Sequence, residues 1–239
     1  LHLCDRRQRQ MCIRDRKIID ISKHNGIIDF DKVKASGKVG GVMIRSSWGH
    51  FREDEQFKRN VSECERLNIP YGFYHYSYAC SYSEMVQEAK ELINLIKDYK
   101  PLLPVAIDME DADGYKAKMG TLNNITLNTE ICRYTCAELE KAGFYAMVYA
   151  NLDWTKTKLN MSMLAPYDLW LARWNANSPS RKCGMWQYTN SASVNGIAGR
   201  VDMSKAYIDY PSLIKEHGLN GWKESEIPEE EENEFEKEW

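Results

Sequence analysis

Two carboxylates, Asp108 and Glu110, stand two residues apart at the end of the short apolar run 104–107. Side chains alternate between the faces of a β-strand, so a strand here would point both carboxylates to one side, roughly 6–7 Å apart. Such a pair is costly to bury because like charges repel and resist desolvation. Glycoside hydrolysis needs this arrangement, since one carboxyl keeps its proton as an acid while its neighbour stays charged. A strand that ends in solvent with two hydrated acids would give the same pattern.

The charge of the chain is concentrated at its two ends. The 239 residues have a net charge of −3, but residues 1–16 hold five Arg against two Asp, and residues 223–239 hold nine Glu against two Lys. The residues between them are close to neutral, which argues against a nucleic-acid-binding surface. No apolar run approaches the ~20 residues of a membrane span. We therefore expect neither nucleic acid nor a membrane as partner, and we expect a monomer.

Neither end has the pattern of a folded element. Residues 1–16 lack hydrophobic periodicity and the apolar region of a signal peptide, and they resemble translated adapter sequence. We expect this segment to be non-native or disordered. Residues 223–239, with Pro228 and the acidic run Glu229–Glu232, are typical of a disordered tail or linker. The folded domain is expected over 17–222, and the export route stays open.

Cysteine and histidine give no sign of a metal or disulfide framework. The seven Cys are an odd number without a paired spacing pattern. Cys132 and Cys136 lie one helical turn apart, but no second pair completes a zinc site. None of the five His are spaced i, i+4. We expect buried thiols, no metal and no organic cofactor.

Strand-like and helix-like segments alternate between residues 17 and 215. Apolar and alternating runs predict strands over 17–21, 39–46, 71–76, 104–110 and 144–150, and amphipathic spacing predicts helices over 29–36, 54–67, 83–99 and 128–142. After residue 150 the helical pattern fades, and strands are expected over 168–174, 184–188 and 200–203, followed by a short helix over 211–216. Five β-α units followed by three strands predict an α/β fold, a single closed β/α barrel of the TIM-like type.

Six motifs, in this order, resemble glycoside hydrolase family 25, the lysozymes of phage endolysins and bacterial autolysins. They are KIIDISKHNG at 17–26 with the following IDF at 28–30, YGFYHY at 71–76, IDME at 107–110, WLARW at 170–174, MWQY at 185–188 and VDMS at 201–204. The resemblance covers about residues 17–215. It implies the barrel fold and cleavage of the β-1,4 bond between N-acetylmuramic acid and N-acetylglucosamine in bacterial peptidoglycan. It further implies an extracellular or cell-wall-acting protein. The export route stays open, and release by a phage holin is one of the routes that would serve.

The resemblance also assigns roles to four acids. Glu110 corresponds to the general acid/base. Asp108 is expected to stay ionised and to assist attack by the substrate's own N-acetyl group. Asp20 and Asp202 are expected to tune charge and bind sugar hydroxyls, or to act only as hydrogen-bond partners at strand ends. Because barrel active sites lie at the carboxyl ends of strands, we expect Asp20 to end the first strand and Asp202 to end the eighth.

Aromatic and polar side chains near predicted strand ends complete the expected sugar site, because aromatic planes pack on sugar C–H faces and polar groups bind hydroxyls. These substrate-binding candidates are Arg45, Tyr76, Tyr78, Tyr149, Asn151, Trp174, Gln187 and Tyr188. Trp170 and Trp186 are expected in the core, off the faces that carry Trp174 and Gln187. One stretch departs from the family pattern Lys-Ala-(Thr/Ser)-Glu-Gly: residues 45–49 read RSSWG, which keeps a cation and the glycine but lacks the Glu.

Two other functions remain open at this stage. A chitinase-like N-acetylglucosaminidase would share N-acetyl participation, but its motif Asp-x-x-Asp-x-Asp-x-Glu is missing, since Pro104 and Ala106 precede Asp108. A non-catalytic cell-wall-binding barrel would keep the groove without turnover. The intact pair of Asp108 and Glu110 argues against it, since a pure binder would be free to lose two repelling acids.

Overall fold

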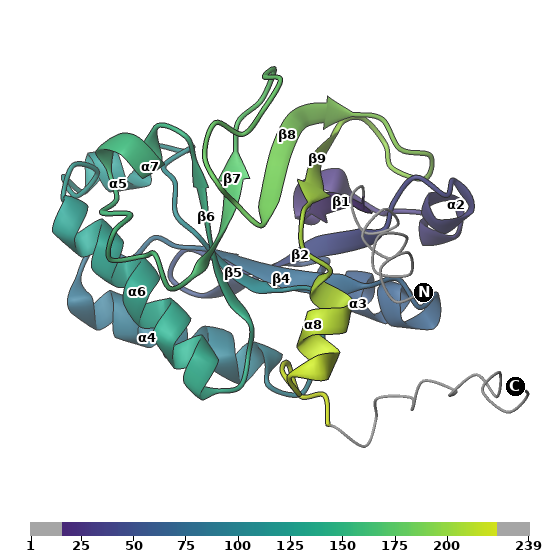
Figure 1. Ribbon diagram of the computed structural model, residues 1–239, viewed down its shortest axis with the longest axis horizontal. Helices are drawn as coiled ribbons and strands as arrows, with labels where there is room; N and C mark the ends of the chain where they lie inside the picture. The colour runs from purple at the N-terminus through teal and green to yellow at the C-terminus, as the bar shows by residue number, and fades with distance from the viewer. Residues whose placement is uncertain (1–15, 224–239) are drawn as a thin grey trace, which may run out of the picture.

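A closed ring of eight strands forms the centre of the molecule in the computed structural model, which describes residues 16–223 (Figure 1). β1 (Arg16–Ile21) pairs with β2 (Gly41–Trp48) on one side and with β9 (Val201–Ala206) on the other, and these two pairings close the ring. β1 thus begins one residue inside the segment that the sequence analysis excluded from the barrel. Residues 1–15 and 224–239, and the predictions that concern them, lie outside the described residues.

The strands follow one another around the ring in chain order. β2, β4 (Tyr71–Tyr76), β5 (Val105–Asp108), β6 (Ala146–Asn151), β7 (Asp168–Ala172) and β8 (Met185–Ala192) are parallel neighbours. β9 runs antiparallel to both β8 and β1. The short strand β3 (Arg52–Glu53) forms a hairpin with β2 outside the ring and was not predicted. The single α/β barrel is confirmed, with a reversed last strand.

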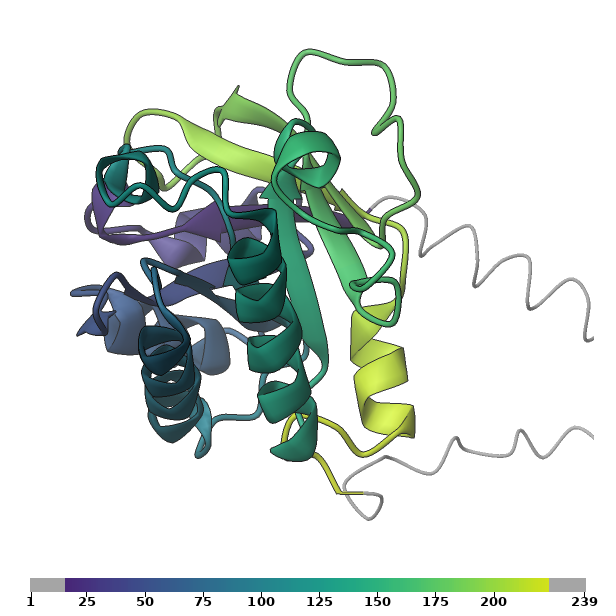
Figure 2. The ribbon, with the colours of Figure 1, turned by 90° about the vertical axis from the view of Figure 1, so that its left-hand side faces the viewer.

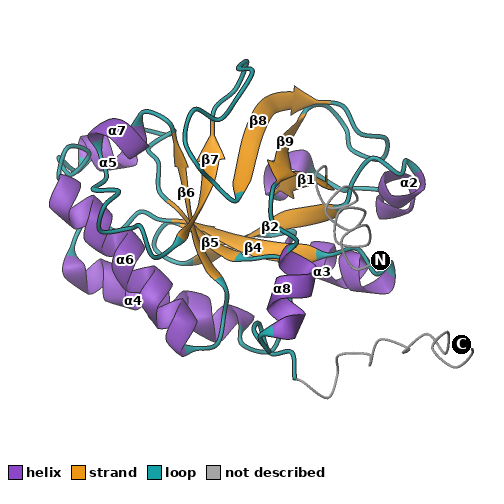
Figure 3. Cartoon of the chain, viewed as in Figure 1, coloured by secondary structure: helices purple, strands orange, loops and turns teal. Residues whose placement is uncertain are grey.

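Four helices cover the outside of the ring (Figure 3). They are α2 (Phe30–Ala35), α3 (Phe57–Arg66), α4 (Tyr82–Ile96) and α6 (Ile125–Lys141), and α4 and α6 run alongside one another (Figure 2). α8 (Tyr210–Glu216) packs with the interior core at the end of the barrel opposite the site. The short helices η1 (Lys23–Asn25), α5 (Tyr115–Lys118) and α7 (Trp154–Thr157) lie in loops. No helix within residues 16–223 is long and apolar enough to cross a membrane.

Strand alternation divides the apolar residues into two cores. Ile18, Met43, Ala106, Met147 and Trp170 pack inside the ring, whereas their chain neighbours pack outward against the helices. The inward face changes character along each strand, because Asp20 follows Ile18 on β1 and Asp108 follows Ala106 on β5. The interior is therefore apolar in its lower part and acidic at the rim to which the parallel strands point.

The two tryptophans predicted to be core are both buried, Trp170 at 1% and Trp186 at 9% exposure. Trp170 was expected to lie off the strand face that carries Trp174, and this reason was wrong. Residues two apart on a strand share a face, so Trp170 lies on the same inward face as Ala172 and leads toward Trp174. Its Nε1 donates to Ser204 Oγ (2.9 Å) across the barrel.

Local capping fixes where the covering helices begin and end. Ser81 Oγ accepts from the Glu84 backbone N–H (3.2 Å), so α4 begins at Tyr82. Asn124 caps α6 in the same way through the N–H of Leu127 (3.0 Å). Gly143, with φ of 83°, follows α6 in the left-handed region that favours glycine.

Candidate active site

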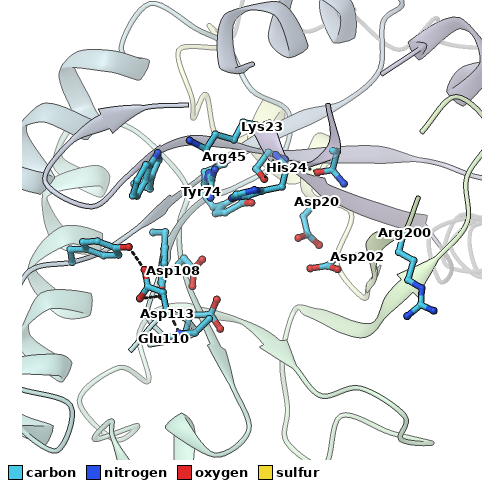
Figure 4. A pocket seen from close by; sticks show the side chains of 16 residues that line it. Asp20, Lys23, His24, Arg45, Tyr74, Asp108, Glu110, Asp113, Arg200 and Asp202 are labelled. Atoms are coloured by element: carbon cyan, nitrogen blue, oxygen red, sulfur yellow. Dashed lines mark hydrogen bonds between the residues drawn. The ribbon is translucent and has the colours of Figure 1, made fainter. Parts of the chain in front are cut away.

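A cavity of about 670 Å³ opens at the acidic rim of the barrel. Asp20, Arg45, Tyr76, Tyr78, Asp108, Glu110 and Asp202 are the predicted site residues that line it. Figure 4 shows Asp20 and Asp202 facing one another, with Asp108, Glu110 and Asp113 gathered on another side. The strand order thus brings four acids from distant parts of the chain into one hollow.

Asp20 and Asp202 lie directly opposite each other in the register between β1 and β9. The prediction that Asp202 ends its strand was wrong. β9 is antiparallel to its neighbours, so its beginning, where Asp202 is the second residue, lies at the rim where β1 ends. Gln187 Nε2 donates to Asp20 Oδ2 (3.0 Å) and to Asp202 Oδ2 (3.4 Å). Burial and the facing charge of Asp202 raise the pKa of Asp20 well above its usual range, and burial also raises the pKa of Asp202.

Asp108 ends β5 and is only 5% exposed. Its Oδ1 is buried and has no hydrogen-bond partner among the described residues. Burial, followed by the charges of Glu110 and Asp20, raises the pKa of Asp108 well above the usual value. Burial and the neighbouring charges thus oppose the ionised form that the sequence analysis expects for Asp108.

Glu110 lies two residues beyond the last residue of β5, which ends earlier than the predicted strand. Met109 between them is fully buried in the outer core, so Asp108 and Glu110 both turn to the cavity. Burial, then the charges of Asp202, Asp113 and Asp111, raise the pKa of Glu110 to about 7. Glu110 therefore keeps its proton up to near neutral pH, as a general acid must.

Tyr76 and Tyr78, which we call the tyrosine wall, hold the loop that follows Glu110. Tyr76 Oη donates to Asp113 Oδ1 (3.2 Å) and accepts from the Ala112 backbone N–H (3.1 Å). Tyr78 Oη also donates to Asp113, and its ring stacks on Tyr115 at 4.2 Å between centroids. Sequence reasoning missed Asp113, although its position in the acid-rich run after Glu110 was a usable signal.

A buried aspartate organises the opposite side. Asp54 is 1% exposed and its Oδ2 accepts from Arg45 Nε (2.8 Å) and from the Lys23 backbone N–H (3.0 Å). The Arg45 guanidinium also pairs with it through Nη2 (2.8 Å). Asp54 thereby ties η1 to the end of β2. The sequence pattern predicts only a helix start at this position, because the partners of Asp54 come from two other segments.

A second polar network supports the tyrosine wall from outside the ring. His75 is fully buried between Ser47 Oγ (2.8 Å from Nδ1) and Glu88 Oε2 (3.3 Å from Nε2). Glu88 Oε1 accepts from the Tyr78 backbone N–H (3.0 Å). Burial opposes ionisation of Glu88, but the contact with His75 outweighs it and lowers its pKa. This network positions Tyr78 rather than facing the cavity.

The remaining predicted residues lie around the cavity rather than in its lining. Gln187 Oε1 accepts from Tyr149 Oη (3.0 Å) and from Trp174 Nε1 (2.9 Å), so these two aromatics orient the amide that binds Asp20. Trp174 is 45% exposed. Asn151 Oδ1 accepts from the Trp154 backbone N–H at the start of α7 (2.9 Å). Tyr188 packs against the outer core, because it alternates with inward Gln187.

Several lining residues were not predicted as site residues. They are Ser22, Lys23, His24, Asn25, Trp48, Tyr74, Ala112, Asp113 and Arg200. Most lie in the segments directly after β1 and β5, where no periodic pattern marks a residue as facing the cavity. Within residues 16–223, no group of three or more His, Cys, Asp or Glu side chains is arranged to hold a metal ion.

A closed β/α barrel with a carboxyl-lined cavity at its rim defines a protein of the glycoside hydrolase type. The family model described as "Glycosyl hydrolases family 25" matches residues 19–197. The chain belongs to this family.

Relatives support the same assignment. The chain is 30% identical over 191 residues to the autolytic lysozyme of Clostridium acetobutylicum, covering 79% of this chain and 55% of that protein. It is 24% identical over 197 residues to lysozyme M1 of Streptomyces globisporus, covering 78% and 66% respectively. The chain thus spans between about half and two thirds of the length of these relatives.

Solved structures show the same fold. The modular autolysin LytC from Streptococcus pneumoniae, in complex with a synthetic peptidoglycan ligand, superposes with a TM-score of 0.71 at 32% identity, covering 80% of this chain and 46% of that chain. The family 25 glycosyl hydrolase from Bacillus anthracis gives a TM-score of 0.69 at 20% identity, covering 87% and 94%. The second likeness concerns the fold alone.

Proposed function

We propose that this protein is a lysozyme that hydrolyses the β-1,4 bond between N-acetylmuramic acid and N-acetylglucosamine in bacterial peptidoglycan. The observation that carries the proposal is the pair of Asp108 and Glu110 in one cavity, with the pKa of Glu110 raised to about 7. Family membership and the lysozyme relatives support the substrate class.

In the proposed mechanism Glu110 acts first. It gives its proton to the glycosidic oxygen as the bond to the anomeric carbon breaks, and the carbonyl oxygen of the substrate's N-acetyl group attacks that carbon. A water molecule then opens the resulting ring and returns a proton to Glu110. This route retains configuration and needs no enzyme nucleophile.

Asp108 stabilises the positive charge that the N-acetyl group acquires. Because Asp108 is buried and poorly solvated, an adjacent positive charge interacts with it strongly. The ionised form of Asp108 is thus favoured most when the transition state forms. An interaction that is stronger in the transition state than in the bound substrate accelerates the reaction rather than only tightening binding. Asp20 and Asp202 would bind sugar hydroxyls and set the charge of the cavity.

The chitinase-like alternative predicts the same acids but a different substrate, and the wall-binding alternative predicts no turnover. We further propose that the protein acts on the cell wall as a monomer, without nucleic acid or a membrane as partner. Residues 17–222 would be the catalytic barrel, flanked by segments that take no part in it.

Mass spectrometry of fragments released from purified peptidoglycan tests the proposal. Products with N-acetylmuramic acid at the reducing end are expected. Reducing N-acetylglucosamine ends would show a glucosaminidase instead. Binding without any released fragment would support the non-catalytic barrel.

A further inference from the structure

Three cationic side chains surround Trp48, which lines the cavity at the end of β2. Lys23 Nζ lies 5.0 Å from the centroid of the Trp48 ring, Arg52 Cζ 5.0 Å and Arg45 Cζ 5.9 Å. Arg52 comes from β3, where it is the direct register partner of Trp48. We call these four residues the Trp48 rim.

The three cations of the Trp48 rim differ in how they are neutralised. Lys23 pairs with Glu55 (2.9 Å) and the buried Arg45 pairs with Asp54. Arg52 is exposed and forms no ion pair with any residue of the described range. Its charge is therefore available to a ligand. Lys23 and Arg45 balance the charges of Glu55 and Asp54, the acids next to the Trp48 rim.

Acidic side chains line another side of the cavity. Asp108, Glu110 and Asp113 lie together there (Figure 4). A negatively charged group on a bound substrate would meet these acids on that side and opposite charge at the Trp48 rim. The charge distribution thus favours an anionic group at the Trp48 rim over the side that carries these three acids.

We propose that the Trp48 rim is the subsite for a carboxylate carried on the lactyl side of a muramoyl residue, with Arg52 as its specificity-determining residue. This inference rests on the proposed function, because that substrate class supplies the carboxylate. N-acetylmuramic acid bears a lactyl ether that ends either in a free carboxylate or in a peptide stem with carboxylates. The contact with the Trp48 ring helps to hold the Arg52 guanidinium in place beside the cavity.

Steady-state kinetics on three soluble glycan substrates tests the proposal. The first carries its non-amidated peptide stems, the second has lost them to an amidase and keeps the lactyl carboxylate, and the third is the second with that carboxylate converted to a neutral methylamide. Arg52→Gln is compared with Lys90→Gln, which removes the same charge from an exposed position on α4. Arg52→Lys serves as the conservative variant.

Arg52→Gln is expected to raise KM about 2–5-fold on a carboxylate-bearing substrate with kcat nearly unchanged, as for an exposed ion pair. The effect should shrink at high ionic strength, be reversed in large part by Arg52→Lys, and be missing on the neutral substrate. An effect on the first substrate alone identifies a stem carboxylate, and an effect on the first two identifies the lactyl carboxylate.

Equal KM values for wild type and Arg52→Gln on all three substrates would overturn this inference while leaving the lysozyme activity in place. An equal rise in KM on the neutral substrate would overturn it as well, because charge recognition would not be involved. If the wild-type protein cleaves none of the three, the proposed function itself fails, and the two failures are thereby told apart.

Discussion

At the scale of single residues, the carboxyl groups of the cavity act as one titrating system. Asp20, Asp108, Glu110 and Asp202 all have raised pKa values, and burial is the first cause of each shift. Interacting acids lose their protons in steps that belong to the group rather than to one residue. The pKa of Glu110 is raised to about 7. The cavity can thus provide both a proton donor and, when positive charge develops, a counter-charge.

Replacing Glu110 by Gln removes the transferable proton without changing size. Turnover on purified cell walls should fall by about 10²–10⁴-fold, while binding to them persists. The stability should respond to pH with a definite sign. The folded state holds the Glu110 proton up to a pKa of about 7 against an ordinary value of 4.5, so ionised Glu110 destabilises the fold at pH 8 and not below about pH 4.5.

Glu110→Gln should therefore raise the free energy of unfolding at pH 8 by up to about 3 kcal/mol, and the gain should diminish as pH falls from 7 to 4.5. Denaturant unfolding at both pH values measures it, with the exposed Glu216→Gln as the matched control. Normal lysis by Glu110→Gln would remove this residue as the acid.

Asp113 contributes to the raised pKa of Glu110 through its charge, after burial and Asp202. Asp113→Asn keeps an acceptor for Tyr76 and Tyr78 but removes that charge. Since Glu110 must be protonated, activity should fall as pH rises through about 7 in the wild type, and this alkaline limb should move to lower pH in Asp113→Asn. The pH dependence of kcat/KM measures the shift. Asp98→Asn, an exposed change two residues beyond the end of α4, should leave the limb in place.

At the scale of elements, a single hydroxyl determines where α4 begins. The amphipathic pattern predicts a helix from residue 83, but Ser81 supplies the cap and α4 begins at Tyr82. Ser81→Ala should lower the free energy of unfolding by about 1 kcal/mol, the usual cost of losing an N-cap. Ser62→Ala, an exposed change within α3, is the matched control and should change it by a few tenths at most. Equal losses in urea denaturation would contradict this assignment.

The strands show which parts of the fold can be predicted from the sequence. Apolar runs predict all eight strands of the ring, because buried strands need them on any topology. They do not predict the direction of β9, which depends on how the chain returns after β8. Asp202 therefore lies at the rim, as predicted, but near the beginning of its strand rather than at the end. The two-residue β3 has no pattern of its own and exists through its pairing with β2.

Some residues of the candidate site could be predicted from the sequence and others could not. Asp20, Asp108, Glu110 and Asp202 could be found because short motifs at strand ends mark them. Asp54 and Trp48 could not, since their contacts come from η1, β2 and β3 together. Tyr188 was misplaced as a cavity residue for a simpler reason: it neighbours Gln187 on β8, and only one of two adjacent strand residues can face inward.

At the scale of the whole molecule, every strand of the described ring has a hydrogen-bonded neighbour on both sides. β1 bonds to both β2 and β9, so within residues 16–223 no strand of the ring is left with an open edge. The interior core extends from Ile18 at one side to Ile214 on α8. The apolar surfaces that stabilise the fold are therefore contributed from within the described range.

Deleting residues 1–15 and 224–239 should for this reason leave folding and activity nearly unchanged, because neither segment has a periodic apolar face to bury. The deletion stops before Arg16, since its backbone pairs with Ala206 where β1 meets β9. Thermal unfolding and the rate of cell-wall lysis measure the outcome, and a melting temperature within about 2 °C of the full chain is expected. A matched deletion that also removes residues 16–18 takes away three paired positions of β1 and the buried Ile18, so it should lower the melting temperature by many degrees. A full-chain protein that is much more stable than the shorter deletion would show that an end segment contributes to the barrel.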